Sequence, residues 1–120
     1  MLINHTNHAS AKWASPQVEA ARAWGEIEDV PFPDIGADWD EARVAQLAEE
    51  NAEKIIEKKP RAVLCQGEFT YVYHFVNLLR AAGIPVLAAT SRREAVEEQA
   101  EDGSVRKVSC FVFARFREYQ

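Results

Sequence analysis

The sequence predicts a single α/β domain over residues 1–120, with a three-layer arrangement, a mostly parallel sheet and a C-terminal antiparallel β-hairpin. The main evidence is the stretch 61–89. It contains a short apolar run at 62–65, then an amphipathic segment, then a second apolar run at 86–89. Strand, helix and strand in this order form a βαβ unit, whose two strands must be parallel. The second observation is a change of pattern after Arg93, where alternating residues predict antiparallel strands.

The helix of the βαβ unit is predicted from the spacing of its apolar residues. Gly67 separates it from the preceding strand, and Gly83 with the following Pro85 ends it. Its apolar positions recur at i, i+3, i+4 and i+7, which places them on one helical face: Val72, Phe75, Val76 and Leu79.

The N-terminal part is predicted to contain a strand, a helix and a second strand. Met1 to Ile3 form a short apolar start, typical of a chain that begins directly in a strand. Ser15-Pro16 is an N-cap followed by proline at the first helical position, and this helix is expected to end near Trp24. Residues 27–32 form the second predicted strand, which prolines terminate.

A long helix is predicted between this strand and the βαβ unit. Asp38 and Glu41 have the spacing of a capping box, and the helix is expected to run to about Lys59. Acidic residues gather at its start and lysines at its end, which complements the helix dipole. Its apolar stripe consists of Val44, Leu47, Ala48, Ala52 and Ile55.

The last part of the chain predicts a β-hairpin. Residues 94–98 would also suit a helix by propensity, but Asp102-Gly103 is a hairpin turn signal and 105–116 is strongly strand-like. The second strand of this hairpin has apolar residues on both faces. We therefore expect a helix layer or a partner subunit to cover it on both sides.

Composition excludes several functional classes. A net charge of −5 argues against a protein that binds long nucleic acid, because such a protein needs a basic face.

No apolar run is long enough to cross a bilayer, so we expect a cytoplasmic protein without membrane contact. Cys65 and Cys110 lie in strand-like apolar runs and are expected to be reduced, packed side chains.

Function is expected where the parallel strands end, because ligands of open parallel sheets bind at the carboxyl ends of the strands. Polar turns follow the predicted strands at these ends, and residues 90–93 form the turn after the fourth strand. Strand order 2-1-3-4 would place the turns after strands 1, 3 and 4 side by side. Strand order 3-2-1-4 would separate the turn after strand 3 from the turn after strand 1. The sequence leaves both orders open. The candidate ligand-binding residues in these turns are Asn4, Thr6, Asn7, His8, Gln66, Gly67, Thr70, Thr90, Ser91 and Arg92.

His5 and Glu68 are the candidate catalytic residues. His5 could act as an acid or base, with a solvated loop histidine as the plainer alternative. Glu68 could be a general base or bind a ribose hydroxyl, or it could only complement the dipole of the following helix. His5 and His8 have no closing ligand pair with metal spacing, so we expect no metal site.

Known cofactor motifs are absent. The turn at Gly67 lacks a GxGxxG fingerprint and the lysine of a phosphate loop, and the chain has no G-x-S-x-G elbow. We therefore expect no dinucleotide cofactor. Arg92 and Arg93 could contact a phosphate or only contribute surface charge.

Three stretches carry a resemblance to a known family: LINHTNHASAKW at the start, QGEFTYVYHF in the centre and FARFREY at the end. They resemble the small Rossmann-like proteins of type III CRISPR systems, a group that is similar to the CARF sensor domains and includes ring nucleases. The resemblance implies binding of cyclic oligoadenylate at the carboxyl edge of the sheet, commonly by dimers. It implies these ligand-facing residues: His5, Thr6, Asn7, Gln66, Gly67, Glu68 and Thr70.

The first functional hypothesis is a ring nuclease that cleaves cyclic oligoadenylate without metal, through attack of a ribose 2′-hydroxyl on the adjacent phosphate. Such a step needs positioning, a base such as His5 or Glu68, and donors that stabilise negative charge. A second hypothesis is a module that sequesters the same ligand. A third is a nucleoside deoxyribosyltransferase-like enzyme with Glu68 as nucleophile.

A homodimer is the expected working unit. A ring with an even number of nucleotides can have two-fold symmetry, and two identical sheet edges would contact it with one set of residues used twice. The apolar content of the last strand, with Phe111, Val112, Phe113 and Phe116, exceeds what one face of a small sheet needs. A monomer whose own helices cover this strand is the alternative.

Overall fold

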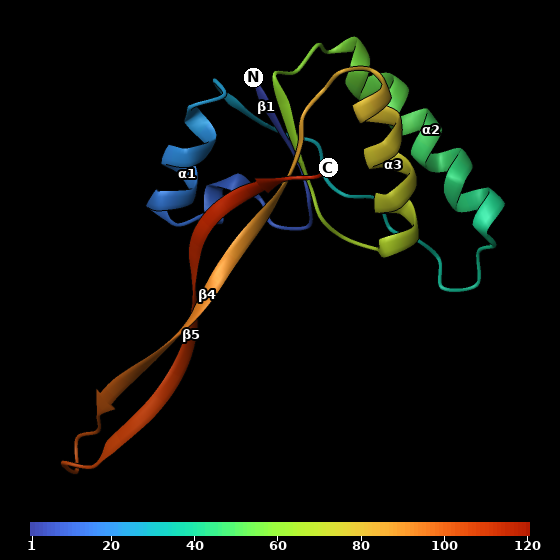
Figure 1. The fold of residues 1–120 in the computed structure, drawn as a ribbon. Helices are drawn as coiled ribbons and strands as arrows, with labels where there is room; N and C mark the ends of the chain where they lie inside the picture. Colours follow the sequence, from blue (N-terminus) through green and yellow to red (C-terminus); the bar gives the residue numbers. More distant parts are fainter.

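The computed structural model describes all 120 residues and shows a mixed α/β fold around one five-stranded sheet (Figure 1). The strands are β1 (Leu2–His5), β2 (Ile27–Asp29), β3 (Ala62–Cys65), β4 (Val86–Gln99) and β5 (Val105–Glu118). The helices are α1 (Ser15–Arg22), α2 (Glu41–Glu57) and α3 (Phe69–Ala81), with a 3-10 turn, η1, at Ser10–Lys12. None of these helices has the length and apolarity that crossing a membrane requires.

The strand order is β2-β1-β3-β4-β5, with parallel pairing throughout except between β4 and β5. Of the two orders that the sequence left open, the structure has the one that places the ends of β1, β3 and β4 together. Val63 of β3 lies opposite Val86 of β4, which confirms the predicted βαβ unit. The predicted mostly parallel sheet with a C-terminal antiparallel hairpin is likewise confirmed.

Helices cover the two faces of the sheet unequally. On one face, α2 and α3 bury Ile3, Val63 and Val86 in the larger core cluster. On the other face, the short α1 covers Leu2 and Leu64 in a smaller cluster. Alternate residues of β1 and β3 thus point into different cores, because successive side chains of a strand point to opposite faces.

The helix predictions agree with the structure except at the ends. The predicted apolar faces of α2 and α3 are buried, apart from Leu47, which is partly buried at the edge of the core. The predicted capping box at Asp38 is wrong: Asp40 is the N-cap of α2, and its side chain accepts a hydrogen bond from the Arg43 backbone N–H. An aspartate can cap a helix at either position, and α2 begins at Glu41, directly after the second one.

The hairpin differs most from its predicted form. Residues 90–93 were expected to form a turn after β4, but β4 continues through them to Gln99. Continuous pairing with β5 satisfies the backbone of this polar stretch, so no turn is needed. The distal parts of both strands form a two-stranded arm, here defined as residues 91–113, which extends away from the body (Figure 1).

No helix layer covers the arm. Phe111 is 77% exposed, and the arm's other apolar residues are at most partly buried. Of the two covers that the sequence left open for β5, a helix layer of the same chain is therefore excluded for the arm, and a partner subunit stays a prediction. An isolated two-stranded hairpin has marginal stability in water, so the exposed arm is an unusual feature of the chain.

We predict that Gly67→Ala destabilises the fold by about 1–3 kcal/mol, the usual cost of overpacking a filled site. A Cβ at this position would clash with Cζ of the buried Phe32 ring. Urea denaturation of Gly67→Ala, Phe32→Leu and the double variant measures the effect. The costs should be less than additive, because the smaller leucine side chain relieves the clash. Fully additive costs would show that the two residues do not compete for space.

Candidate functional site

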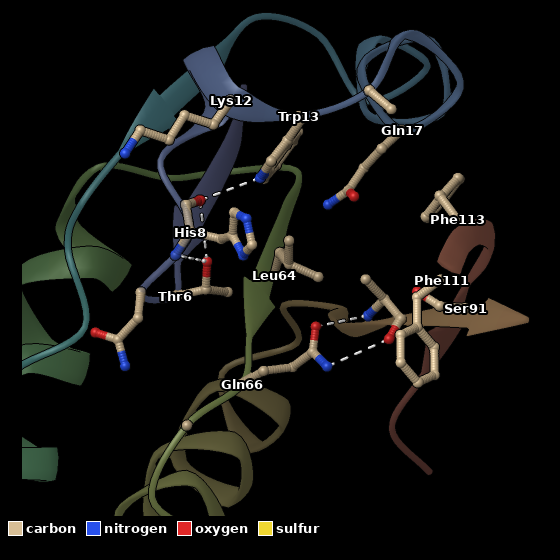
Figure 2. A pocket seen from close by; sticks show the side chains of 14 residues that line it. Thr6, His8, Lys12, Trp13, Gln17, Leu64, Gln66, Ser91, Phe111 and Phe113 are labelled. Carbon is tan, nitrogen blue, oxygen red and sulfur yellow. Dashed lines mark hydrogen bonds between the residues drawn. The ribbon is translucent and has the colours of Figure 1, made fainter. Parts of the chain in front are cut away.

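A cavity of about 500 Å³ opens at the carboxyl edge of the sheet, on the face that α1 covers (Figure 2). Five parts of the chain surround it: the turn after β1, the segment from η1 into α1, the end of β3, β4 and the arm. The lining residues are Thr6, Asn7, His8, Lys12, Trp13, Ala14, Gln17, Leu64, Gln66, Gly67, Ala89, Ser91, Phe111 and Phe113. Six of the predicted site residues are in this set: Thr6, Asn7, His8, Gln66, Gly67 and Ser91.

The turn after β1 is held by Asn4, which is buried and does not line the cavity. Its amide Nδ2 donates to the His8 carbonyl oxygen at 2.8 Å and to Asp29 Oδ1 at 2.9 Å. Its Oδ1 accepts from the Thr6 hydroxyl at 2.8 Å. Asn4 was predicted to bind ligand, but the structure uses it to position Thr6 and His8.

Gln66 forms the wall between β3 and β4. Its side-chain amide accepts from the Ala89 backbone N–H at 2.8 Å and donates to the Ala89 carbonyl at 3.2 Å, the dashed lines beside Gln66 in Figure 2. These two bonds continue the pairing of β3 with β4 beyond the last ladder pair, Leu64 with Leu87. Gln66 therefore fixes the width of the cavity at this edge.

His5 lies in the core between the sheet and α3, not in the cavity. Its side chain is buried, with Nδ1 2.7 Å from the Val30 carbonyl and Nε2 2.7 Å from the Tyr71 hydroxyl. Asn51 Nδ2 donates to the same hydroxyl at 3.1 Å. A neutral imidazole with its proton on Nδ1 satisfies all three groups, and burial lowers the pKa of His5. This environment does not suit the catalytic role that the sequence predicted.

Glu68 is the N-cap of α3. Its carboxylate accepts hydrogen bonds from the Thr70 hydroxyl and from the backbone N–H groups of Thr70 and Tyr71. These bonds lower the pKa of Glu68, chiefly through the Thr70 hydroxyl. A carboxylate with a lowered pKa that is already hydrogen-bonded is a poor general base. Neither Glu68 nor Thr70 lines the cavity.

Two residues of β4 that were predicted to bind ligand also lie outside the cavity lining. The Thr90 hydroxyl donates to the Arg115 carbonyl across the hairpin at 2.9 Å. Arg92 is exposed on the arm and points to the face opposite Ser91, because successive residues of a strand alternate. Of the residues in the turn predicted at 90–93, Ser91 alone lines the cavity.

Sequence reasoning missed the part of the site that η1, α1 and the arm supply. The missed residues include Lys12, Trp13, Gln17, Phe111 and Phe113. Trp13 Nε1 donates to the His8 carbonyl at 3.1 Å, which ties the segment before α1 to the turn after β1 (Figure 2). The stretch LINHTNHASAKW, which carried part of the family resemblance, contains Lys12 and Trp13, so it held a signal for these two residues.

A β-bulge places the arm's phenylalanines in the site. Thr90 pairs with Arg115 and Ser91 with Phe113, so Ala114 is an extra residue in β5. The bulge puts Phe113 and Phe116 on the same face, where their ring centroids lie 5.1 Å apart. Without Ala114 as an extra residue, strand alternation would turn Phe111 and Phe113 to the face opposite α1.

The cavity lining suits a planar, anionic ligand. It contains the cation Lys12 and the histidine His8, three amide side chains, two hydroxyl groups and three aromatic rings, and it has no carboxylate. This differs from the acidic chain as a whole, whose net charge is −5. No group of three or more His, Cys, Asp or Glu residues that could hold a metal ion is present.

A model of one protein family, described as the uncharacterized protein MJ1673 family, matches residues 1–117. No curated protein and no solved structure matches the chain.

We predict that His5 makes stability depend on pH. Its folded pKa is lowered from 6.5, so the unfolded chain takes up a proton first as the pH falls. Its contribution to stability is complete above pH 6.5 and is lost as the pH falls from there towards the folded pKa. The slope of unfolding free energy against pH in this window should be shallower in His5→Asn, by at most about 1.4 kcal/mol per pH unit. Equal slopes in chemical denaturation of both proteins would contradict the prediction.

Proposed function

We propose that this chain, which belongs to the uncharacterized MJ1673 family, binds a cyclic oligoadenylate in the cavity at the carboxyl edge of its sheet. The observation that supports the proposal is the lining itself. A lysine in a lining that contains no carboxylate suits a phosphate, and aromatic rings with amide groups suit adenine bases. The layout of the sheet is compatible with a Rossmann-like fold, in which ligands bind at this edge.

The three aromatic rings are placed where bases could stack. Trp13 is held by its hydrogen bond to the His8 carbonyl, and Phe111 and Phe113 line the opposite wall (Figure 2). Gln17 and Asn7 line the cavity as well, and no hydrogen bond occupies either side-chain amide. These amides are available for the Watson–Crick edge of a base, whereas the Gln66 amide is already bonded to Ala89.

We further propose that the protein cleaves the ring by attack of a ribose 2′-hydroxyl on the adjacent phosphorus. The new bond joins O2′ to phosphorus, and the bond from phosphorus to O5′ breaks, which leaves a 2′,3′-cyclic phosphate and a 5′-hydroxyl. His8 accepts the 2′-hydroxyl proton, and Lys12 donates a proton to the leaving oxygen. His8 replaces His5 and Glu68 as the base because it lines the cavity and they do not.

Sequestration without cleavage is the second candidate. It is favoured by the small number of titratable groups in the lining, which are His8 and Lys12 alone. A deoxyribosyltransferase-like reaction has less support, because it needs a carboxylate nucleophile in the cavity and Glu68 caps α3 instead.

The proposed working unit is a homodimer. A cavity of about 500 Å³ lies within the range of about 300–1,000 Å³ that accommodates a drug-sized ligand. A ring of several nucleotides is larger than such a ligand. Two copies related by a two-fold axis would offer two cavities to one symmetric ring.

We predict that Lys12→Ala weakens binding of cyclic oligoadenylate at least about tenfold, the usual cost of a lost charge-assisted hydrogen bond. Lys54→Ala is the matched control, because Lys54 is an exposed cation on α2 outside the cavity. Titration with fluorescent rings of different sizes measures both affinities. Failure of every ring to bind, or equal losses in both variants, would contradict the proposed site.

Cleavage is tested separately with His8→Gln. We expect the variant to keep ring affinity and to lose cleavage by about 10²-fold or more, the contribution of a general base. Chromatography of the reaction products measures it. Intact rings after long incubation with the unmodified protein would leave sequestration as the function. Full cleavage by His8→Gln would show that another group is the base.

A further inference from the structure

We propose that the arm packs, through the face that carries Phe111, against the same face of the arm of a second copy, in antiparallel orientation about a two-fold axis. The tip of each arm would then close the cavity of the other copy. The inference rests on the proposed homodimer and names the surface that forms it. Three observations support it: exposed apolar residues on one face, charge complementarity along that face, and a cavity whose wall continues into the arm.

The face is defined by strand pairing. Successive pairs of β4 with β5 alternate between the two faces of the arm. The pairs on the Phe111 face are Ser91–Phe113, Arg93–Phe111, Ala95–Ser109, Glu97–Lys107 and Gln99–Val105. Phe111 is 77% exposed and Val105 is 61% exposed. The opposite face has one strongly exposed large apolar residue, Val96, at 45%.

Charge complementarity selects antiparallel packing with a second copy of this chain. Arg93 and Glu97 lie on opposite sides of the pair Ala95–Ser109, one step away in each direction. A two-fold axis that runs across the two strands at this pair reverses the direction of the second arm. It brings Arg93 of each copy opposite Glu97 of the other, because a two-fold interface uses one patch twice. The small side chains at the axis allow the two arms to approach closely. Parallel packing needs a two-fold axis along the arm, which would lay β4 of each copy over β5 of the other. Arg93 would then face Phe111 and have no carboxylate opposite it.

The same axis brings apolar groups together. Phe111 of one copy would cover the aliphatic stem of Lys107 in the other, since both belong to the pairs that face each other. Val105 would reach the pair Ser91–Phe113 of the other copy. Ser91 and Phe113 line the cavity, so the partner's tip would form the wall that a single chain leaves open. The site is therefore incomplete in one copy, and the dimer encloses its ligand.

Charge reversal tests the arrangement. In Arg93→Glu alone, two glutamates face each other across each contact, and in Glu97→Arg alone, two arginines do. Each variant should dimerise at least about tenfold more weakly than the unmodified protein, because an attractive pair becomes repulsive at two symmetric positions. An equimolar mixture should restore a dimer containing one chain of each, since both of its contacts then join opposite charges.

Analytical ultracentrifugation over a dilution series measures the dimer, and native mass spectrometry of the mixture identifies its composition. Arg92→Glu is the matched control, because it changes the same charge on the opposite face and should leave dimerisation unchanged. Circular dichroism of each variant checks that the fold is retained.

A monomeric unmodified protein, an Arg93→Glu variant that dimerises normally, or a mixture that stays monomeric would overturn the proposed interface. These outcomes are independent of ligand. A dimer that follows the charge rules but binds no cyclic oligoadenylate would refute the proposed function and leave the interface standing. A dimer that binds the ring but does not respond to these charge changes would refute the interface and leave the proposed function standing.

Discussion

The buried polar end of β1 is the constraint on which the site depends. Asn4 and His5 are each 1% exposed, and an unpaired polar group at such a position would cost about 1–3 kcal/mol. Each must therefore have specific partners. Asn4 finds them in the turn after β1 and in Asp29, and His5 finds them in Val30 and Tyr71. These bonds hold β2, the first turn and α3 in one arrangement, and the cavity forms beside it.

The division of β1 between two faces explains why two neighbouring histidines have different environments. His5 is the last residue of the strand and points into the core under α3, where burial lowers its pKa. His8 lies three residues later in a turn that hydrogen bonds from Asn4 and Trp13 hold beside the cavity. Proton transfer to a ligand needs contact with the ligand, so geometry assigns any such role to His8.

The arm contributes both to the cavity and to an exposed apolar surface outside it. Continuous pairing of β4 with β5 extends the sheet beyond the body, and the bulge at Ala114 turns Phe111 and Phe113 towards α1. One end of the arm therefore lines the cavity while its remainder exposes apolar side chains. Exposed apolar residues that gather on one face are typical of an interaction surface. In the proposed dimer a second copy would cover this face and would close the cavity with the same contact.

Local pattern by itself determined the elements of this protein. The spacing of Val72, Phe75, Val76 and Leu79 defined α3, and the apolar runs on either side of it defined two parallel strands. The turn signal at Asp102-Gly103 separated the hairpin strands. All of these features depend on neighbouring residues alone, so the sequence was enough to predict them. The local pattern also located the ligand-binding edge of the sheet, because the βαβ unit fixes the direction of its parallel strands.

Tertiary structure decided which polar residues at that edge face the cavity. Asn4 and Thr6 are two residues apart in similar surroundings in the sequence, yet Asn4 is used inside the fold and Thr6 lines the cavity. Lys12 and Trp13 line the cavity because the segment from η1 into α1 packs beside the turn after β1. The strand order and the bulge in β5 depend on pairing between distant segments. The spacing of residues along the chain does not specify such pairing, and only the folded chain brings these side chains together.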